Sequence, residues 1–115
     1  MNFKKIHNEK DRKEEFDRIQ SKYAERIPII VETNPRSKDL PKLSKNKFLV
    51  PRSITFGQFM YIIRSRMKLK QEQALFIFVN NILPTNSQTV QEIYQQHKDE
   101  DGFLYCLITA ENTFG

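Results

Sequence analysis

The sequence predicts an α+β fold in which one four-stranded mixed sheet carries helices, within a single domain of 115 residues. Two capping-box patterns, Thr55 with Gln58 and Thr89 with Glu92, each begin a segment whose apolar residues recur at helical spacing. Short blocks of β-branched and aromatic residues stand between these segments, as is typical of strands. Helices packed on one sheet would give the chain a single core.

Composition limits the function to a few classes. The chain has 19 Lys and Arg against 14 Asp and Glu, a net charge of +5, which favours acidic partners. Apolar residues form short blocks, and none approaches the run of about 20 that crosses a bilayer. The single cysteine, Cys106, excludes an internal disulfide and fits a reducing compartment. Because Met1 leads directly into charged residues, we expect no secretory signal and a cytoplasmic protein.

The N-terminal 25 residues are mostly charged and predict helices. We expect a short helical turn at 4–7 and a longer helix at 10–23. Asn8 would cap the longer helix, and Asp11 in its first turn would suit the helix dipole. The narrow apolar stripe of this helix consists of Phe16, Ile19 and Tyr23.

Two strands should follow as an antiparallel pair. Residues 27–31 are almost continuously β-branched, which predicts a strand with neighbours on both sides. A polar, proline-containing loop at 32–46 leads to a second strand, Lys47-Phe48-Leu49-Val50-Pro51. Because proline cannot donate a ladder hydrogen bond, this strand should lie at an edge. An edge strand leaves backbone groups free to accept a strand from another molecule.

The C-terminal half predicts helix, strand, helix and strand. These elements are a helix that starts at Thr55, a strand at 74–79, a second helix starting at Thr89, and a last strand at 103–108. The apolar face expected for the first of these helices consists of Phe56, Phe59, Met60, Ile63 and Met67. With the first and last strands parallel in the middle, the order gives the β-grasp arrangement of ubiquitin with two additional N-terminal helices. We therefore expect a helical extension at 1–25, a β-grasp core at 26–109 and a flexible tail at 110–115.

The sequence offers no catalytic or metal-binding pattern. His7 and His97 lie ninety residues apart, and the three glycines form no phosphate loop. Cys106, within an apolar strand, is interpreted as a core residue. The carboxylates of Asp99, Glu100 and Asp101 fall in a turn and are interpreted as solvated. We expect neither an enzyme nor a cofactor.

The positive charge leaves an RNA-binding alternative open. Residues 101–107 are weakly similar to an RNA-recognition strand, because aromatic residues alternate there, but an acid replaces the expected cation. Phe103 and Tyr105 could stack on bases, although a core position explains their alternation better. We expect no nucleic-acid partner.

From about Lys10 to Gly115 the chain resembles the family of autophagy-related protein 8 and GABARAP, which are ubiquitin-like modifiers. The blocks that carry the resemblance are Lys22-Tyr23-Ala24-Glu25-Arg26-Ile27-Pro28, Lys47-Phe48-Leu49-Val50-Pro51, Thr55-Phe56-Gly57-Gln58-Phe59, Phe78-Val79-Asn80-Asn81, Lys98-Asp99-Glu100-Asp101-Gly102-Phe103-Leu104-Tyr105 and Glu111-Asn112-Thr113-Phe114-Gly115. The family usually has Phe where Glu9 stands, and a more polar stretch where Cys106-Leu107-Ile108 stands.

The resemblance implies conjugation to a lipid. Gly115 would be adenylated, passed through activating and conjugating enzymes as a thioester, and joined to phosphatidylethanolamine. Lacking a Cβ, it could enter a narrow catalytic channel. A processing or deconjugating cysteine protease is a further implied partner. The protein would be cytoplasmic when free and bound to autophagosomes or other intracellular membranes when lipidated, with no cofactor beyond the covalent lipid.

The resemblance also implies a docking site for autophagy receptors and adaptors that carry an acidic, then aromatic-x-x-aliphatic, motif. The aromatic pocket would consist of Glu15, Ile19, Pro28, Ile30, Lys47, Leu49 and Phe103. The aliphatic pocket would consist of Phe48, Val50, Pro51, Ile54, Phe59 and Ile62. A basic rim for the acids would consist of Arg26, Lys45, Lys47 and Arg64. An unconjugated peptide-binding scaffold remains the main alternative, and a basic RNA-binding domain is the less favoured one.

Overall fold

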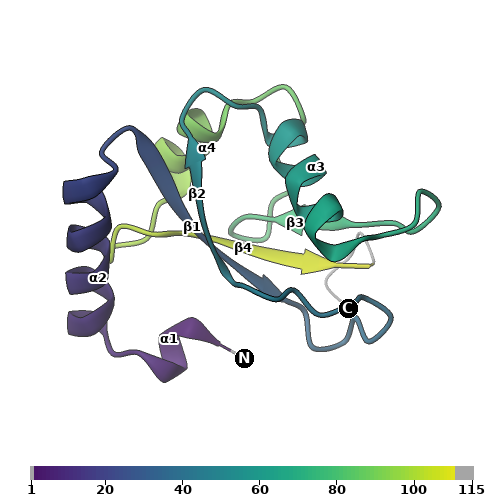
Figure 1. Cartoon of the computed structure of the whole chain (residues 1–115), viewed down its shortest axis with the longest axis horizontal. Coiled ribbons are helices and arrows are strands. Elements are labelled where there is room, and N and C mark those ends of the chain that lie inside the picture. The colour runs from purple at the N-terminus through teal and green to yellow at the C-terminus, as the bar shows by residue number, and fades with distance from the viewer. Residues whose placement is uncertain (1, 111–115) are drawn as a thin grey trace.

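Two parallel strands form the middle of the sheet, as the sequence predicts. In a computed structural model of the chain, which describes residues 2–110, β1 (Arg26–Thr33) runs parallel to β4 (Leu104–Thr109). The strand β2 (Lys47–Pro51) pairs antiparallel with β1, and β3 (Phe76–Phe78) pairs antiparallel with β4. The strand order is therefore β2-β1-β4-β3 (Figure 1), which places β2 at an edge.

Four helices accompany the sheet, and their starts follow the predicted caps. They are α1 (Phe3–Ile6), α2 (Glu9–Lys22), α3 (Phe56–Met67) and α4 (Val90–His97). The side chain of Asn8 accepts a hydrogen bond from the backbone N–H of Asp11 at 2.8 Å. Both predicted capping boxes are present, at Thr55 and at Thr89. Local sequence thus fixes where the three longer helices begin.

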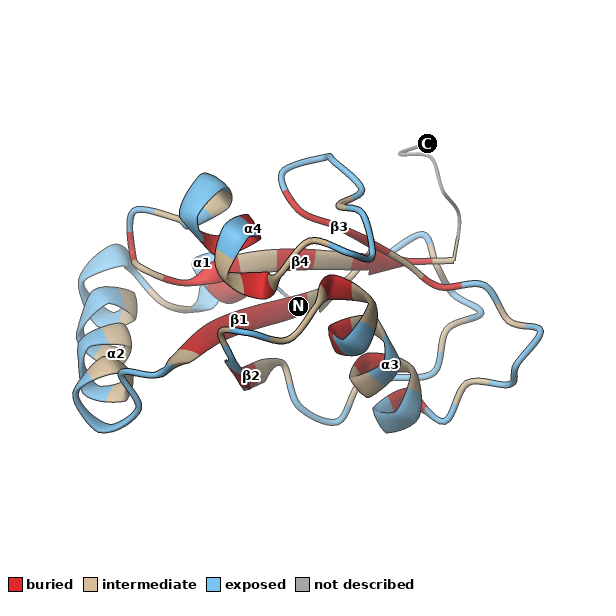
Figure 2. Ribbon diagram, turned by 90° about the horizontal axis from the view of Figure 1, so that it is seen from above, coloured by how far each residue is buried: buried red, intermediate tan, exposed pale blue. Residues whose placement is uncertain are grey.

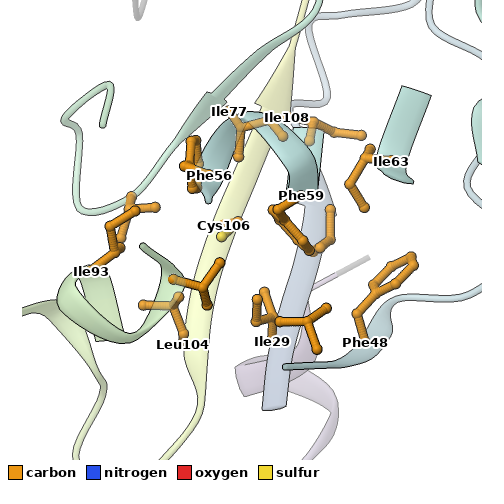
Figure 3. Packing of buried hydrophobic residues seen from close by; sticks show 14 of the residues in the cluster. Ile29, Phe48, Phe56, Phe59, Ile63, Ile77, Ile93, Leu104, Cys106 and Ile108 are labelled. Atoms are coloured by element: carbon orange, nitrogen blue, oxygen red, sulfur yellow. The ribbon is translucent and has the colours of Figure 1, made fainter. Parts of the chain in front are cut away.

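The main core lies between one face of the sheet and helices α3 and α4. Because side chains alternate across a strand, Ile29 and Leu104 face this core while their neighbours point the other way. Helix α3 contributes Phe56, Phe59 and Ile63, all at most 2% exposed. Figure 3 shows these side chains meeting those of the strands, and Figure 2 shows burial concentrated on the inward faces of the two helices.

A smaller apolar cluster occupies the opposite face of the sheet. Its buried members are Phe3 of α1, Ile30 of β1 and Phe103, which precedes β4. Phe16 and Ile19 of α2 pack against them, together with Tyr105. The N-terminal helices are therefore joined to the sheet by an aromatic cluster of their own.

Several predicted boundaries need correction. Strand β3 covers residues 76–78 and not 74–79, because Ala74 is exposed and Asn80 and Asn81 take left-handed conformations with φ of 49° and 65°. The two N-terminal helices each start and end one residue earlier than predicted, and β4 starts and ends one residue later. Tyr23, a residue of the predicted apolar stripe, is 43% exposed and contributes little to the core.

None of the helices in the described part of the chain combines the length and the apolar composition that crossing a membrane requires.

Candidate functional site

The edge strand β2 has backbone groups that do not pair with β1. The register of the ladder, with Pro28 opposite Leu49, decides which residues of β2 carry these unpaired groups. Val31 donates its backbone N–H to Asn46 at 2.7 Å, and the register pairs Ile29 with Phe48. In an antiparallel ladder, hydrogen-bonded and non-hydrogen-bonded pairs alternate. Pro28, which has no N–H, lies opposite Leu49 in a non-hydrogen-bonded pair. The backbone groups of Leu49 therefore point away from β1.

Three residues of β2 share this outward orientation. Lys47 and Leu49 each offer an N–H and a C=O on the open side, while Pro51 offers only a C=O. The guanidinium of Arg26 already donates to the carbonyl of Leu49 at 3.2 Å. A carbonyl oxygen has two lone pairs, so it can accept from a second donor as well. The edge is thus suited to accept a short added strand.

The residues predicted for the aromatic pocket gather on the face of the sheet that carries α2. Within this set Ile30 and Phe103 are fully buried, and Pro28 is buried beside them. Leu49 and Ile19 are half-buried. The set therefore has a buried apolar floor and a partly accessible apolar wall.

The residues predicted for the aromatic pocket also contact a salt bridge between β2 and α2 and the ring of Phe3. The ammonium of Lys47 contacts the carboxylate of Glu15 on α2. The same ammonium lies 5.6 Å from the ring centroid of Phe3, which itself packs on Phe103 at 5.6 Å between centroids. A ligand ring would reach the buried floor only after the Lys47 and Glu15 side chains move.

Most of the residues predicted for the aliphatic pocket gather on the opposite face, beside α3. Phe48, Val50 and Phe59 are buried in the main core, with Phe48 and Phe59 edge to face at 6.3 Å between centroids. Ile54 and Ile62 are half-buried and Pro51 is exposed, so these three carry the accessible surface of the set. Because alternate residues of a strand face the same side, Pro51 lies on the face of Leu49, and the structure does not place it with the other residues predicted for the aliphatic pocket.

The predicted basic rim is not one cluster of free cations. Lys45 is exposed, and its ammonium lies 5.2 Å above the ring of Phe48. Arg26 is half-buried and bonded to Leu49. Arg64 directs its guanidinium to the carbonyls of Gln73 and Lys70, at 2.8 and 2.9 Å. It thereby supports the loop that follows α3.

One predicted solvated carboxylate is in fact buried. Asp101 is 1% exposed and not in solvent as expected, because Arg12 of α2 donates to it through Nε at 2.8 Å. The hydroxyl of Tyr105 donates to the same oxygen at 2.5 Å, and the N–H of Phe103 donates to the other at 2.9 Å. Asp99 is half-buried, and only Glu100 is exposed as predicted. A buried carboxylate with these partners joins α2 to β4.

The environment of Asp101 shifts the pKa values of its partners. The hydrogen bond to Asp101 raises the pKa of Arg12. Burial raises the pKa of Tyr105 strongly, and the neighbouring carboxylate adds to the effect because it would repel a phenolate. At neutral pH the Arg12 guanidinium therefore stays charged and the Tyr105 phenol stays neutral.

Sequence reasoning missed Phe3, Arg12 and Asp101. Phe3 is a lone aromatic residue in a charged segment, which was the available signal for a packing role. The Arg12–Asp101 pair spans 89 positions, so no local pattern could show it. These residues hold the N-terminal helices beside the aromatic set.

The structure argues against the RNA-binding alternative, because the residue expected to stack on a base, Phe103, is buried. Phe103 is 0% exposed and packs against Phe3 and Phe16, so its ring cannot stack on a base. Cys106 is buried as predicted, and burial raises the pKa of its thiol. In the described range 2–110, no three His, Cys, Asp or Glu side chains gather as a metal site. Gly115, the predicted conjugation residue, lies outside the described residues.

Comparisons with known proteins decide the family. Residues 11–115 match the protein family described as "Autophagy protein Atg8 ubiquitin like". Autophagy-related protein 8 of Mycosarcoma maydis is 50% identical over 98% of this chain and 95% of its own length. The chain belongs to the Atg8 family. As an Atg8 protein it is a ubiquitin-like modifier of autophagy and not an enzyme, and its family is conjugated to phosphatidylethanolamine.

Other Atg8 relatives agree with this assignment. Autophagy-related protein 8B of Oryza sativa subsp. indica is 50% identical over 98% of this chain and 94% of its own length. Among solved structures, Plasmodium falciparum Atg8 in complex with a Plasmodium falciparum Atg3 peptide is similar to this chain with a TM-score of 0.90. Its sequence identity is 34%, and the match covers 99% of both chains. The β-grasp sheet and the N-terminal helices are thus those of an Atg8 protein.

Proposed function

We propose that this Atg8 chain is attached through Gly115 to phosphatidylethanolamine and presents β2 as a docking edge for short peptides. The single observation that supports the docking role is the edge position of β2 between two apolar sets on opposite faces. An added peptide strand would pair with Lys47 and Leu49, and its alternate side chains would reach the two faces.

The expected ligand is an extended peptide with an aromatic and an aliphatic residue three positions apart. The aromatic side chain would enter beside Leu49 and Ile19, after Lys47 separates from Glu15. The aliphatic side chain would lie on Ile54 and Ile62. Acidic residues ahead of the motif would pair with the released ammonium of Lys47 and with Lys45, and would mainly raise the association rate and the specificity. Receptors, adaptors and the conjugating enzyme are the partner classes that carry such motifs.

Peptide titration by calorimetry tests the docking edge. Leu49→Ala should weaken binding of a motif peptide by about 2 kcal/mol or more, because a buried anchor contact is lost. Leu83→Ala is the matched control, since it is the same substitution at an exposed position (42%) in the loop between β3 and α4. Lys47→Glu should also weaken binding, whereas Lys22→Glu should not. Equal affinity of Leu49→Ala and the original chain would show that the peptide binds elsewhere.

Reconstitution tests the conjugation. The chain would be incubated with the activating and conjugating enzymes, ATP and vesicles that contain an aminophospholipid. Intact mass should show the added lipid, and Gly115→Ala should abolish it. Release of the lipid-linked form by the cysteine protease would support the reversible cycle, in which the chain is cytoplasmic when free and membrane-bound when conjugated. A lipid adduct that forms as readily on Gly115→Ala would contradict attachment at Gly115, and an unconjugated peptide-binding scaffold would show no adduct in either chain.

A further inference from the structure

The net positive charge of the chain resides in two segments, 34–46 and 64–73. Together they contain eight Lys or Arg and two acidic residues, Asp39 and Glu72. The whole chain has 19 basic and 14 acidic residues, so the remainder has 11 and 12. Without these two segments the protein would carry a slightly negative net charge.

The two segments lie at one end of the sheet. Segment 34–46 follows the last residue of β1, and Asn34 donates its backbone N–H to Ile108 of β4 at 2.8 Å. Segment 64–73 shortly precedes β3, whose first residue, Phe76, pairs with Thr109 at the end of β4. Figures 1 and 2 show both connections at the end of the molecule opposite α2.

The chain leaves the sheet at this same end. The N–H of Ala110 donates to the hydroxyl of Ser37 at 2.9 Å, and that hydroxyl lies 2.9 Å from the hydroxyl of Thr109. The exit of the C-terminal segment is thereby fixed to the first basic segment. Gly115 is five residue steps beyond Ala110, and five steps span at most about 17 Å.

The cations of this end are available for an external anion. Seven of the eight are exposed, namely Arg36, Lys38, Lys42, Lys45, Arg66, Lys68 and Lys70. None of them forms an ion pair with an acid between positions 2 and 110. Arg64, the eighth, holds the second segment in place through Lys70 and Gln73. We refer to these eight residues as the basic end.

We propose that the basic end is a membrane-facing surface that binds the phosphate-bearing headgroups of anionic phospholipids. The inference rests on the proposed attachment at Gly115, because that attachment would hold the bilayer within about 17 Å of Ala110. The molecule is 39 Å along its longest axis, and α2 lies at the other end (Figure 1). Charges interact with the surface only when they come within about 8 Å at physiological ionic strength. The attachment lets the basic end approach that closely, whereas α2 lies at the far end of the long axis (Figure 1). The contact orients the docking edge relative to the bilayer.

Vesicle partitioning of the full unconjugated chain tests the surface. The vesicles are phosphatidylcholine alone or with 30% phosphatidylserine, a proportion of about one anionic lipid in three. The test variant carries Lys38→Gln, Lys42→Gln, Lys68→Gln and Lys70→Gln. The control carries Lys10→Gln, Lys13→Gln, Arg18→Gln and Lys22→Gln, which removes the same charge from the exposed side of α2. Glutamine has nearly the helix propensity of lysine and arginine, so the control helix is preserved.

The original chain should partition onto the serine-containing vesicles, and salt should reduce the binding. The test variant should partition at least about tenfold more weakly, while the control stays within about twofold of the original chain. Equal losses in both variants, or none in either, would overturn the proposal. A gel shift with RNA is run in parallel, and lost RNA binding with unchanged vesicle binding would assign the basic end to RNA instead.

Conjugation is measured separately on vesicles of phosphatidylethanolamine and phosphatidylcholine, which have no net negative charge. Both variants retain Gly115, so intact mass should show the lipid adduct in each. Absence of the adduct even in the original chain would contradict the proposed function, whatever the partitioning result.

Energy transfer gives the orientation of the conjugated chain. Dyes are placed through Ser44→Cys in the first basic segment or Ser21→Cys on α2, both exposed positions, with an acceptor lipid in the vesicle. Cys106 is 2% exposed and should not be labelled. On serine-containing vesicles, transfer from position 44 should exceed that from position 21, and the four substitutions in the basic end should reduce the difference. A dye at position 21 that transfers more strongly would contradict the proposed orientation.

Discussion

The ring of Phe16 in α2 lies where a side chain at Gly102 would have to stand. Gly102 has a φ of +99°, and a Cβ added to it would be 2.5 Å from Cγ of Phe16. Glycine is therefore required at this turn both by its backbone conformation and by the close approach of a ring from the N-terminal helix.

Gly102→Ala should lower the free energy of unfolding by about 2 kcal/mol or more, because it combines a strained backbone with a steric clash. Gly57→Ala is the comparison, since its Cβ would be 3.2 Å from Asn86 without a left-handed φ, and it should cost less. Denaturant unfolding measures both. In a Phe16→Ala background the cost of Gly102→Ala should fall, and an unchanged cost would show that the ring is not the cause.

Asp101→Asn should destabilise the protein by about 3 kcal/mol, because it leaves the Arg12 guanidinium, with a side chain 11% exposed, without its charged partner. Asp17→Asn is the matched control at an exposed position of α2, and it should change the stability by less than about 0.5 kcal/mol.

Arg12→Lys tests the geometry of the same contact. Lysine keeps the charge, but it has one nitrogen in place of the two, Nε and Nη1, with which Arg12 reaches Asp101 at 2.8 Å and the carbonyl of His7 at 2.7 Å. We expect a loss of stability that charge retention does not prevent, measured by thermal and denaturant unfolding. A fully stable Arg12→Lys protein would show that the charge alone matters.

Stability should decrease in acid because of Asp99. Burial would raise the pKa of this carboxyl, but the ammonium of Lys4 at 2.5 Å and the N–H of Asp101 at 3.1 Å bond to its charged form, and the net pKa is lowered. The unfolded chain therefore takes up this proton at a higher pH than the folded protein does. The stabilisation is present above about pH 4, the usual aspartate pKa, and is lost as the pH falls through the lowered value.

Denaturant unfolding at a series of pH values from 7 to 3 tests this dependence. Asp99→Asn should flatten the acid limb of the profile relative to the original chain. Asp17→Asn, at an exposed position of α2, again serves as the control for the loss of one negative charge. An identical acid limb in Asp99→Asn would assign the acid sensitivity to other carboxylates.

The thiol of Cys106 should be unreactive in the folded protein. It is 2% exposed, and burial raises its pKa, so little thiolate forms at neutral pH. A chromogenic disulfide reagent should modify it only at the rate of unfolding, and denaturant should release one thiol per chain. Fast modification of the native protein would show that β4 opens locally.

Most of the fold could be predicted because its signals are local. The caps at Asn8, Thr55 and Thr89 mark helix starts, since each satisfies backbone donors a few residues away. Pro51 indicated an edge strand because a missing N–H is a property of that residue alone. The antiparallel partner and the parallel middle pair then followed from the order of the elements.

The features that sequence could not predict depend on contacts between residues far apart in the chain. Asp101 lies among acidic neighbours that suggest solvent, and its partner Arg12 is 89 positions away. Phe3 packs on Phe103 across almost the whole chain. The predicted strand at 74–79 was too long, because apolar composition indicates burial of Leu75 and Val79 but does not show that β4 pairs only with residues 76–78, while Val79 forms an isolated bridge with Ile82. The positions of Arg26 and Arg64 depended on side-chain hydrogen bonds, and that of Lys45 on its contact with the ring of Phe48, and none of these could be read from their spacing.

The proline at the end of β2 has a consequence for self-association. An open sheet edge can template the stacking of identical chains into fibres. Here the unpaired ladder is confined to Lys47 and Leu49, since Pro51 supplies no donor and the preceding stretch enters an irregular loop. An edge this short can pair with a short peptide that is held mainly by its side chains. It is too short to support stacking of many copies of the protein through β2. The same residue that shapes the docking edge thus limits the stacking of copies through β2.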